Sequence, residues 1–557
     1  MHIFIIWILI FWVLLRVNLM MQNNILFNAD GFAYLQMSHY LNAGSLEGLG
    51  TWWFGFLYSA CISLFDFVVN NSFLSSQIVN LILFFIGGIL LFFIAQKYLH
   101  MYYNWVLIAL YTFSSPLIYY NINILSENLY IVLFLWLVLI LLAYLDHEEV
   151  YKLWLAWVMV WLMYITRGEA FIYLIPLICI SLCVSVARHK ELWTFLWGIV
   201  TLLLWFFIIA GPYIYYLHSI TGEWGLTNKW ASNIRQAMMR GIERMDDEGF
   251  ERAVGELTDD KKHLKSGFVG GLKYEKAESG YGLFDYIEKN QEKFFSTWRQ
   301  NTEKLFIEIM PKMIIGDFIQ AYKSPDFKYK DYTFIYYILF IPLFFTAYGM
   351  ALMYLDKRRF VLFIFTPFFL TACAFFTMFF VLERYFIILL PLFLLFMVYG
   401  MQGLWRKITV IQNVRLVLYG GTILAISLLG LNTYYNNLNV LPYSAKKNAW
   451  VWLQKNLEKE FPWKKTVKIM ERFPVVTYYS GTWERWLTPY ANQADLLAYA
   501  KANDIDVLVV DSLDFKTYRP QLAYLLDEKS ILKSNLLDLI YKEQKYGEKV
   551  ILYKIKK

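Results

Sequence analysis

Long apolar stretches alternate with short polar turns through most of the chain. A bilayer core of about 30 Å requires about 20 apolar residues in a helix, or fewer where the helix is tilted or broken. By that criterion we expect about eleven membrane-spanning helices in a mainly α-helical, polytopic membrane protein. They cover residues 2–22, 75–96, 104–119, 127–145, 153–166, 170–187, 192–214, 332–355, 360–381, 385–403 and 416–433.

Composition indicates the same class of protein. Of the 557 residues, 59% are hydrophobic and 20% are aromatic, whereas an ordinary soluble domain is about half apolar. The four cysteines lie in apolar surroundings, so no disulfide framework is expected in the soluble parts. Residues 2–22 lack a basic leading region and a small-residue cleavage site, which favours a retained anchor over a cleaved signal peptide.

Basic residues between the spans predict the orientation of the protein, because short loops that carry Lys and Arg stay in the cytoplasm. With a cytoplasmic N-terminus, the short outer loops contain only two basic residues, Arg167 and Arg384. We therefore expect a multi-pass protein of the cell membrane with its N-terminus in the cytoplasm. The inner loops contain Lys97, Lys152, Arg188, Lys190, Lys357, Arg358, Arg359, Arg406, Lys407 and Arg415.

The first outer loop, residues 23–74, contains no Lys or Arg. Its apolar stretch from Trp52 to Val69 could form another span, but a span there would invert the orientation of every later basic loop. We therefore expect interfacial helices that lie on the outer leaflet.

A second outer loop, residues 215–331, interrupts the hydrophobic pattern and is rich in charge. The pattern from Tyr286 to Met313 predicts an amphipathic helix or a pair of helices. The loop could also be a solvated linker without an active role.

The chain changes character after the last expected span. We expect a transmembrane domain over residues 1–433 and an extracytoplasmic α/β domain over residues 434–557. This second domain contains no Gly-rich nucleotide fingerprint and no Walker loop, so neither a nucleotide-driven mechanism nor a nucleic-acid partner is expected. Its expected helices are Ala445–Leu457 and Ala494–Lys501, and its expected strands are Thr466–Met470, Val507–Val510, Leu537–Tyr541 and Val550–Tyr553.

Charged residues gather at the outer rim of the expected spans. Such charges are costly near a membrane and are usually retained because they pair or act in function. The four rim turns contain Asp30, the Ser126-Glu127-Asn128 run, the Arg167-Gly168-Glu169 run and the Glu383-Arg384-Tyr385 run.

Each rim residue has two interpretations. Asp30 could act as a general base on an acceptor hydroxyl, or it could cap a helix. Glu127 could orient an acceptor or share a cation with Asp30, or it could stabilise the start of a helix. Arg384 could bind a lipid phosphate through its guanidinium fork, or it could pair with Glu383 or extend to lipid headgroups. Arg167 could simply pair with Glu169.

Metal binding would rest on carboxylate oxygens, because none of the seven histidines has zinc-like spacing with Cys or Glu. Mg²⁺, Mn²⁺ or Ca²⁺ would suit such ligands. A metal-free mechanism stays open.

The layout resembles the GT-C fold glycosyltransferases that use polyprenyl-phosphate sugar donors. This group includes protein O-mannosyltransferases and the lipid A aminoarabinose transferase. Short motifs carry the resemblance: DGFAY at 30–34, LSENLY at 125–130, YITRGE at 164–169, ERY at 383–385 with Pro391, and the runs at 211–224, 472–481 and 505–510.

The resemblance implies a function and a set of site residues. It implies transfer of a hexosyl or pentosyl group to a lipid, glycan or protein acceptor at the outer face, with inversion at the anomeric carbon. Asp30 would be the base and Glu127 the second acid. The donor phosphate would be bound by Arg384 and Arg167, and the substrates would be contacted by Tyr34, Glu169 and Glu383.

Two other classes of function compete with this reading. A transporter or flippase of a lipid-linked saccharide would commonly show internal repeats and ionisable residues near the membrane middle. No repeat is evident here, and the charges gather at one rim. A binding or assembly protein that used the membrane part as an anchor would require one span rather than about eleven.

Overall fold

The computed structural model describes two compact units. Of the described residues, those within 13–18, 37–224 and 292–408 fall in the first unit, and those within 29–36, 287–291 and 444–556 fall in the second. The structure describes residues 13–14, 17–18, 29–45, 54–147, 149–187, 192–221, 224, 287–288, 290–315, 333–379, 381–408, 444–464, 466–472, 475–480, 485–486, 488–527, 536–545 and 547–556.

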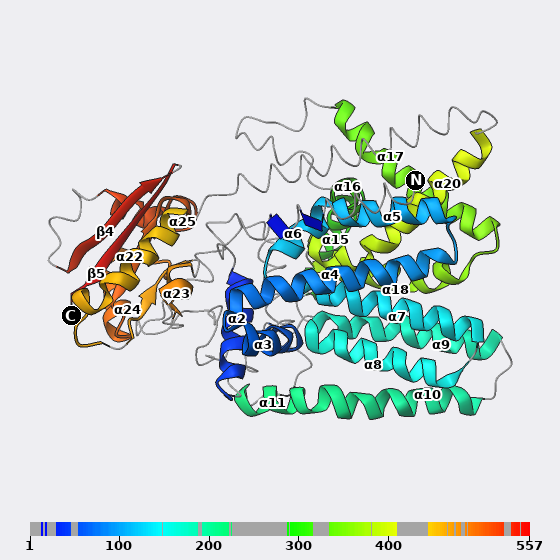
Figure 1. The fold of residues 1–557 in the computed structure, drawn as a ribbon, viewed down its shortest axis with the longest axis horizontal. Coiled ribbons are helices and arrows are strands. Elements are labelled where there is room, and N and C mark those ends of the chain that lie inside the picture. Colours follow the sequence, from blue (N-terminus) through cyan, green and yellow to red (C-terminus); the bar gives the residue numbers. More distant parts are fainter. Residues whose placement is uncertain are drawn as a thin grey trace. The chain divides into compact units, whose positions relative to one another are not determined.

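The first unit is a bundle of helices that run side by side (Figure 1). Among the described residues, six helical stretches are long and apolar enough to cross a membrane. The expected spans at 75–96, 127–145, 170–187, 192–214, 360–381 and 385–403 each fall on one of them, which confirms a multi-pass membrane protein. The six stretches are Ser72–Gln96, Glu127–His147, Gly168–Val186, Trp197–Ser219, Phe360–Met378 and Glu383–Arg406.

The helices that build these stretches have the following bounds. They are α4 (Ser72–Gln96), α7 (Glu127–His147), η2 (Gly168–Tyr173) with α9 (Leu174–Ala187), α10 (Leu192–Trp205) with η3 (Phe206–Ala210) and α11 (Gly211–Thr221), α18 (Phe360–Phe379), and α19 (Glu383–Phe386) with η8 (Ile387–Leu389) and α20 (Leu390–Ile408).

Two further expected spans, at 153–166 and 332–355, each fall on one helix. These helices are α8 (Val150–Thr166) and α17 (Thr333–Leu355). The expected span at 416–433 and most of the span at 2–22 lie outside the described residues. The total of about eleven therefore stays a prediction.

The expected span at 104–119 is not one helix. The chain forms α5 (Met101–Phe113) and α6 (Ser115–Ile122), and Ser114 between them has φ −57° and ψ 117°. Pro116 lies in the first turn of α6, where its missing N–H is tolerated, but it could not donate within a continuous helix. The expected span thus falls on a broken helix rather than a continuous one, and its crossing of the membrane stays a prediction.

Prolines also accompany two π-helical turns. The turns η3 (Phe206–Ala210) and η5 (Leu305–Ile309) each end two residues before a proline, Pro212 and Pro311. A proline cannot donate to the carbonyl four residues earlier, and its ring crowds that carbonyl. A local i→i+5 turn relieves the crowding without ending the helix.

The first outer loop contains α2 (Ala29–Asn42) and α3 (Leu57–Val69). The 13 residues of α3 extend about 20 Å, which is too short to cross a bilayer core. A helix in the apolar stretch is therefore confirmed, and its position on the outer leaflet stays a prediction. The described part of the second outer loop forms α15 (Gln291–Lys304), η5 and α16 (Met310–Ile315), within the range expected for amphipathic helices.

The described residues after 443 form an α/β domain. Its sheet has the strand order β2-β1-β3-β5-β4, in which β1, β2 and β3 are parallel and β5 is antiparallel to both β3 and β4. The strands are β1 (Ile469–Met470), β2 (Arg485–Trp486), β3 (Val507–Asp511), β4 (Leu537–Lys545) and β5 (Glu548–Ile555). The helices are α22 (Ser444–Glu460), α23 (Val475–Ser480), α24 (Gln493–Ala502), α25 (Ser512–Tyr518) and η9 (Pro520–Leu526).

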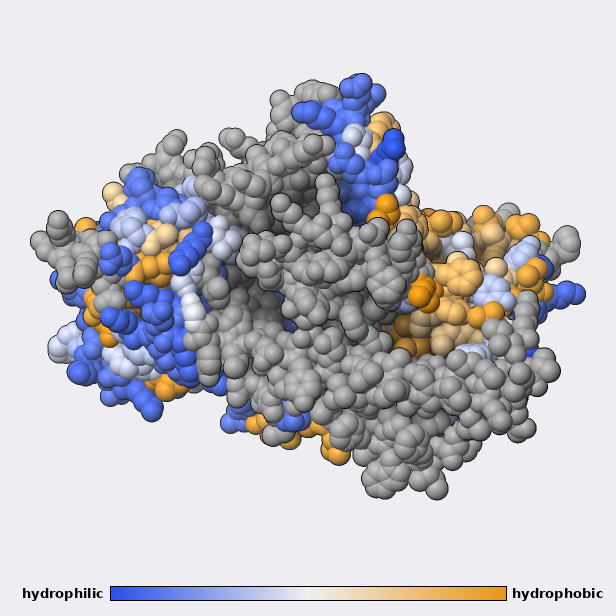
Figure 2. Space-filling view, turned by 90° about the horizontal axis from the view of Figure 1, so that it is seen from above, coloured by the Kyte–Doolittle hydropathy of each residue, from blue (hydrophilic) through white to orange (hydrophobic). Residues whose placement is uncertain are grey.

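Alternate residues of β3 fill two separate cores of this domain. Val507 and Val509 pack in a core with Leu453 of α22, whereas Leu508 and Val510 pack in a core with Leu496 of α24. The period of two places helices on both faces of the sheet. Figure 2 shows hydrophobic surface over the helical bundle and mostly hydrophilic surface over this domain.

Candidate functional site

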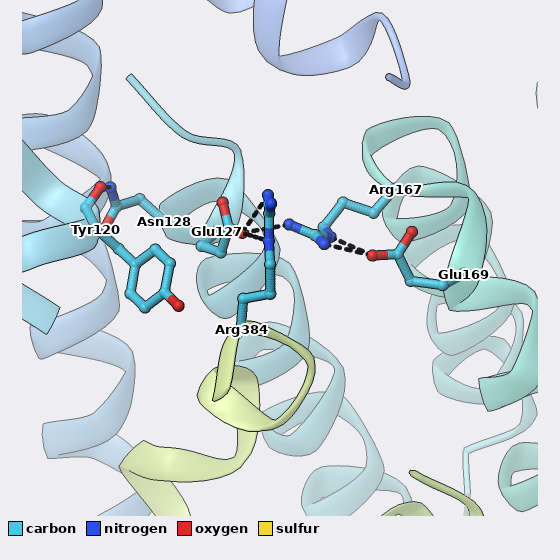
Figure 3. A network of polar contacts seen from close by, with 6 residues as sticks. All are labelled: Tyr120, Glu127, Asn128, Arg167, Glu169 and Arg384. Carbon is cyan, nitrogen blue, oxygen red and sulfur yellow. Dashed lines mark hydrogen bonds and ion pairs between the residues drawn. The ribbon is translucent and has the colours of Figure 1, made fainter. Parts of the chain in front are cut away.

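Three of the predicted rim turns meet in a polar network at one end of the helical bundle (Figure 3). Glu127 is the first residue of α7, where the positive end of the helix dipole favours a carboxylate. Arg167 lies at the C-terminal end of α8, and Arg384 lies in the short helix α19. The basic inner-loop residue Lys97 lies at the opposite end of the bundle, where it pairs with Asp146 near the last turn of α7.

One carboxylate oxygen of Glu127 accepts from both guanidinium groups. Arg167 Nη1 lies 2.5 Å from Glu127 Oε1. Arg384 Nε and Nη2 each lie 2.8 Å from the same oxygen. Such charge-assisted bonds are stronger than bonds between neutral groups. Glu127 therefore joins α8 to α19.

Arg167 also binds the second glutamate of the network. Its Nε donates to Glu169 Oε1 over 2.6 Å, and its Nη2 forms an ion pair with the same oxygen. The Arg167 guanidinium carbon lies 5.8 Å from the centre of the Tyr130 ring, a distance at which the ring face attracts a cation. The expected pair of Arg167 and Glu169 is thus present, and it belongs to a larger network.

Exposure differs sharply within the network. The side chains of Glu127 and Arg167 are 0% and 3% exposed, and that of Glu169 is 8% exposed. The Arg384 side chain is 23% exposed. Two carboxylates and two guanidiniums cancel in formal charge, and Arg384 is the most exposed of these four side chains.

Aromatic packing holds the helix that carries Arg384. The ring of Tyr385 stacks on Phe376 of α18 with centroids 4.5 Å apart, and Phe386 is fully buried. Glu383 begins α19 and is half-buried beside Arg384. The four-residue helix is therefore fixed against its neighbours rather than mobile on its own.

Asp30 and Tyr34 belong to the second unit. Asp30 lies in the first turn of α2, which begins at Ala29, so it is inside the helix rather than at the N-cap position expected from the capping interpretation. A carboxylate there still interacts favourably with the helix dipole. Tyr34 is 1% exposed. The prediction that these two residues act with Glu127 and Arg384 stays a prediction.

The carboxylates of the network are already paired with cationic side chains. Glu127 and Glu169 both bind guanidinium groups, which an incoming cation would have to displace. Among the described residues, no group of three or more His, Cys, Asp or Glu is arranged to hold an ion. The divalent cation stays a prediction.

Sequence reasoning missed a second polar cluster, centred on Asn80 of α4. Its side chain joins Tyr58 of α3 to the backbone of Asn121 and Asn123, which precede Glu127. The signal was available in the sequence, because an amide within an apolar span is costly unless it is hydrogen-bonded.

Comparisons with known proteins agree with this architecture. The chain matches no protein-family model and no curated protein sequence. Among solved structures, ArnT from Cupriavidus metallidurans bound to undecaprenyl phosphate matches with a TM-score of 0.51 at 10% identity, over 98% of each chain. The apo state of the same enzyme has a TM-score of 0.52 at 9% identity, over 98% of this chain and 97% of that one.

A second match is the archaeal oligosaccharyltransferase AglB from Archaeoglobus fulgidus in complex with an inhibitory peptide and a dolichol-phosphate. Its TM-score is 0.51 at 12% identity, over 92% of this chain and 70% of that one. Another structure of this oligosaccharyltransferase is a complex with Zn and sulfate. The apolar helices, the second α/β unit and these matches together show that the chain has the GT-C fold.

Proposed function

We propose that this chain is an integral membrane glycosyltransferase that moves a sugar from a polyprenyl-phosphate-linked donor to an acceptor at the outer face of the membrane. The fold supports this, because matching structures contain undecaprenyl phosphate or dolichol-phosphate. The observation that carries the proposal is the buried network in which Arg384 alone is partly exposed among four charged residues. A guanidinium suits a phosphate because it offers parallel donors and stays charged.

The reaction requires one proton transfer and one substitution. Asp30 takes the proton of an acceptor hydroxyl as the acceptor oxygen attacks the anomeric carbon of the donor sugar. The bond between that carbon and the phosphate oxygen breaks, and the polyprenyl phosphate leaves with the electron pair. Attack opposite the leaving group inverts the anomeric carbon. Arg384 stabilises the negative charge that develops on the phosphate.

The other network residues support this step. Glu127 orients the Arg384 guanidinium, and Arg167 holds Glu127 from the buried side while adding positive charge behind the phosphate. Tyr34, Glu169 and Glu383 are the remaining residues proposed to contact substrates. The sugar is a hexose or a pentose, and the acceptor is a lipid, a glycan or a protein.

A lipid-linked donor explains the position of the site. The bilayer delivers the donor to the rim, so the prenyl chain stays among apolar helices while the sugar phosphate reaches Arg384. The sugar–phosphate bond is already activated, so no nucleotide is needed at that face. We propose that the N-terminus is cytoplasmic and that the site and the α/β domain are extracytoplasmic.

A reconstitution experiment separates transfer from transport. The purified protein would be placed in liposomes that contain polyprenyl-phosphate sugars, and candidate acceptors would be added outside. We expect free polyprenyl phosphate and a glycosylated acceptor in equal amounts. Movement of intact donor between leaflets without release of polyprenyl phosphate would instead favour a flippase and contradict the proposal.

A further inference from the structure

Asn80 is a buried amide within the apolar helix α4. Its side chain is 1% exposed, and α4 is one of the stretches apolar enough to span a membrane. An amide at that depth finds no water to bind, so each of its polar atoms requires a partner from the protein. A leucine there would avoid that requirement, so hydrophobic packing alone does not explain an asparagine.

All the polar atoms of the Asn80 side chain are used. Its Oδ1 accepts from the Tyr58 hydroxyl over 2.9 Å. Its Nδ2 donates to the carbonyl oxygens of Asn121 and Asn123 over 3.1 and 2.8 Å. The Nδ2 of Asn121 donates back to the Asn80 carbonyl over 2.7 Å. The two asparagines therefore bind each other in both directions.

These bonds fix the connector between α6 and α7. Asn121 is in the last turn of α6, and Asn123 follows the helix, so their carbonyls are among those that a helix end leaves without intrahelical partners. Asn128 Nδ2 donates to the Tyr120 carbonyl over 2.8 Å and ties the start of α7 to α6. Glu127 lies four residues after Asn123, so the bonds to Asn80 hold the chain just before it.

The same cluster reaches the element that carries Arg167. Tyr58 belongs to the first turn of α3, and Gly55 just before it packs on the end of α8. A Cβ at Gly55 would lie 2.1 Å from the Ile165 carbonyl oxygen. The segment from Gly55 to Tyr58 thus contacts both α8, beside Arg167, and Asn80, which holds the connector to Glu127.

We infer that Asn80 is a positioning residue, which holds Glu127 in the geometry that the Arg167 and Arg384 guanidiniums require. Its kinetic consequence rests on the proposed function, whereas its structural consequence does not. Removing the amide releases two connector carbonyls, and Glu127 then moves relative to Arg384. A displacement of about 1 Å in a catalytic arrangement can lower a rate about a hundredfold.

The test compares Asn80→Leu with Asn104→Leu. Asn104 is also a fully buried asparagine, and its Nδ2 donates to the Phe92 carbonyl, where α4 ends and α5 begins, near Lys97 at the end of the bundle opposite the rim residues. Each variant would be examined in the full chain by thermal unfolding, by hydrogen exchange of residues 119–128 and by release of polyprenyl phosphate. The pair Asn80→Ser and Asn104→Ser, which keeps a hydroxyl at each position, replaces the leucine variants if those do not fold.

We expect both leucine variants to lower the unfolding temperature. Only Asn80→Leu should speed exchange at residues 121–128 and lower turnover, by about a hundredfold. Combined with Glu127→Gln, Asn80→Leu should add little further loss of turnover, because both changes act on one group. Asn104→Leu should leave the turnover of Glu127→Gln unchanged, just as it leaves that of the wild type unchanged.

Two results would overturn the inference. One is unchanged hydrogen exchange at residues 121–128 in Asn80→Leu. The other is a double variant, Asn80→Leu with Glu127→Gln, whose fold loss of turnover equals the product of the losses of the two single variants. A wild-type protein that releases no polyprenyl phosphate would count against the proposed function, while the exchange measurement still decides whether Asn80 holds the connector.

Discussion

At the scale of single residues, the rim network combines burial with charge neutrality. Glu127 accepts from two guanidiniums through one oxygen, and Arg167 donates to two glutamates. A buried ion pair adds little net stability over apolar packing, but removal of one partner leaves an uncompensated buried charge. The cost of such groups is therefore better explained by a role in function than by a role in folding.

This arrangement predicts unequal effects of the two arginines on stability. Arg167→Leu leaves Glu127 and Glu169 without their shared buried cation and should destabilise the protein by about 3–5 kcal/mol. Arg384→Leu should cost clearly less, because its side chain is 23% exposed and Glu127 keeps Arg167. Thermal unfolding in detergent would measure both variants. A larger loss in Arg384→Leu would contradict the geometry.

Ligand binding provides a second prediction for these residues. Glu127 and an incoming phosphate compete for the Arg384 guanidinium. Glu127→Gln should therefore bind polyprenyl phosphate more tightly than the wild type, while Arg384→Gln should bind it more weakly. Titration of the detergent-solubilised protein with polyprenyl phosphate would measure both affinities. Weaker binding by Glu127→Gln would show that its carboxylate does not compete for Arg384.

At the scale of elements, two glycines allow α17 and α20 to pack closely. A Cβ at Gly349 would lie 1.8 Å from the Phe396 carbonyl oxygen, and a Cβ at Gly400 would lie 2.2 Å from the Phe345 carbonyl oxygen. Small residues at such contacts let helix backbones approach in a membrane. Because α20 continues the chain from α19 through η8, the packing of α20 also affects the position of Arg384 in α19.

Gly349→Ala should therefore force α17 and α20 apart and cost about 1–3 kcal/mol. Gly88→Ala is the matched control, because its Cβ would meet the Tyr111 ring at an ordinary 3.7 Å. That control should be neutral or slightly stabilising, because alanine has a higher helix propensity than glycine. Unfolding temperatures would test the pair, and equal temperatures would refute the close contact.

The α/β domain contains its own buried charges. Lys446 Nζ lies 2.7 Å from Asp514 Oδ2 and 3.0 Å from Asp511 Oδ2. Glu548, at the start of β5, is 2% exposed, and its burial raises its pKa to about 7 even though Lys446 opposes the shift. The folded domain therefore keeps Glu548 protonated at pH values where the unfolded chain releases the proton.

The sign of this effect predicts how stability changes with pH. In the unfolded chain the Glu548 carboxyl has a pKa of 4.5. The free energy of unfolding is therefore highest below that pH, and it falls as the pH rises from 4.5 to about 7. The loss is at most about 3 kcal/mol. Glu548→Gln should thus slow hydrogen exchange in β5 at pH 8 and leave it unchanged at pH 4, after correction for intrinsic exchange rates.

The exposed Glu458 of α22 provides the control for that experiment. Glu458→Gln should leave exchange in β5 unchanged at both pH values. Equal exchange in Glu548→Gln and the wild type at pH 8 would show that the Glu548 carboxylate is not buried.

At the scale of the whole molecule, hydrophobic periodicity predicted most of the architecture. The long spans and the helices and strands of the α/β domain were predictable because their patterns extend over several turns or strand repeats. The two-residue strand β2 and the six-residue helix α23 were missed because such short elements carry too little pattern. The break at Ser114 was missed because apolar residues continue on both sides of it.

The candidate site was predictable as a set of rim charges but not as a network. The alternation of inner and outer loops along the chain predicted Glu127, Arg167 and Arg384 at one rim, and the structure joins all three in ion pairs. Sequence spacing suggested separate local pairs, such as Arg384 with Glu383. The structure instead pairs Arg384 with Glu127, which lies 257 positions away in the chain. Long-range pairs of this kind depend on how the helices pack.

Asp30 is the proposed base of the transfer reaction. The direct measurement is release of polyprenyl phosphate by the reconstituted protein with donor and acceptor. Asp30→Asn would be compared with Asp66→Asn, which changes the carboxylate that accepts from Asn42 and Ser72 in the same outer loop. We predict loss of acceptor-dependent release in Asp30→Asn and retention in Asp66→Asn. Release by Asp30→Asn at the wild-type rate would contradict the claim.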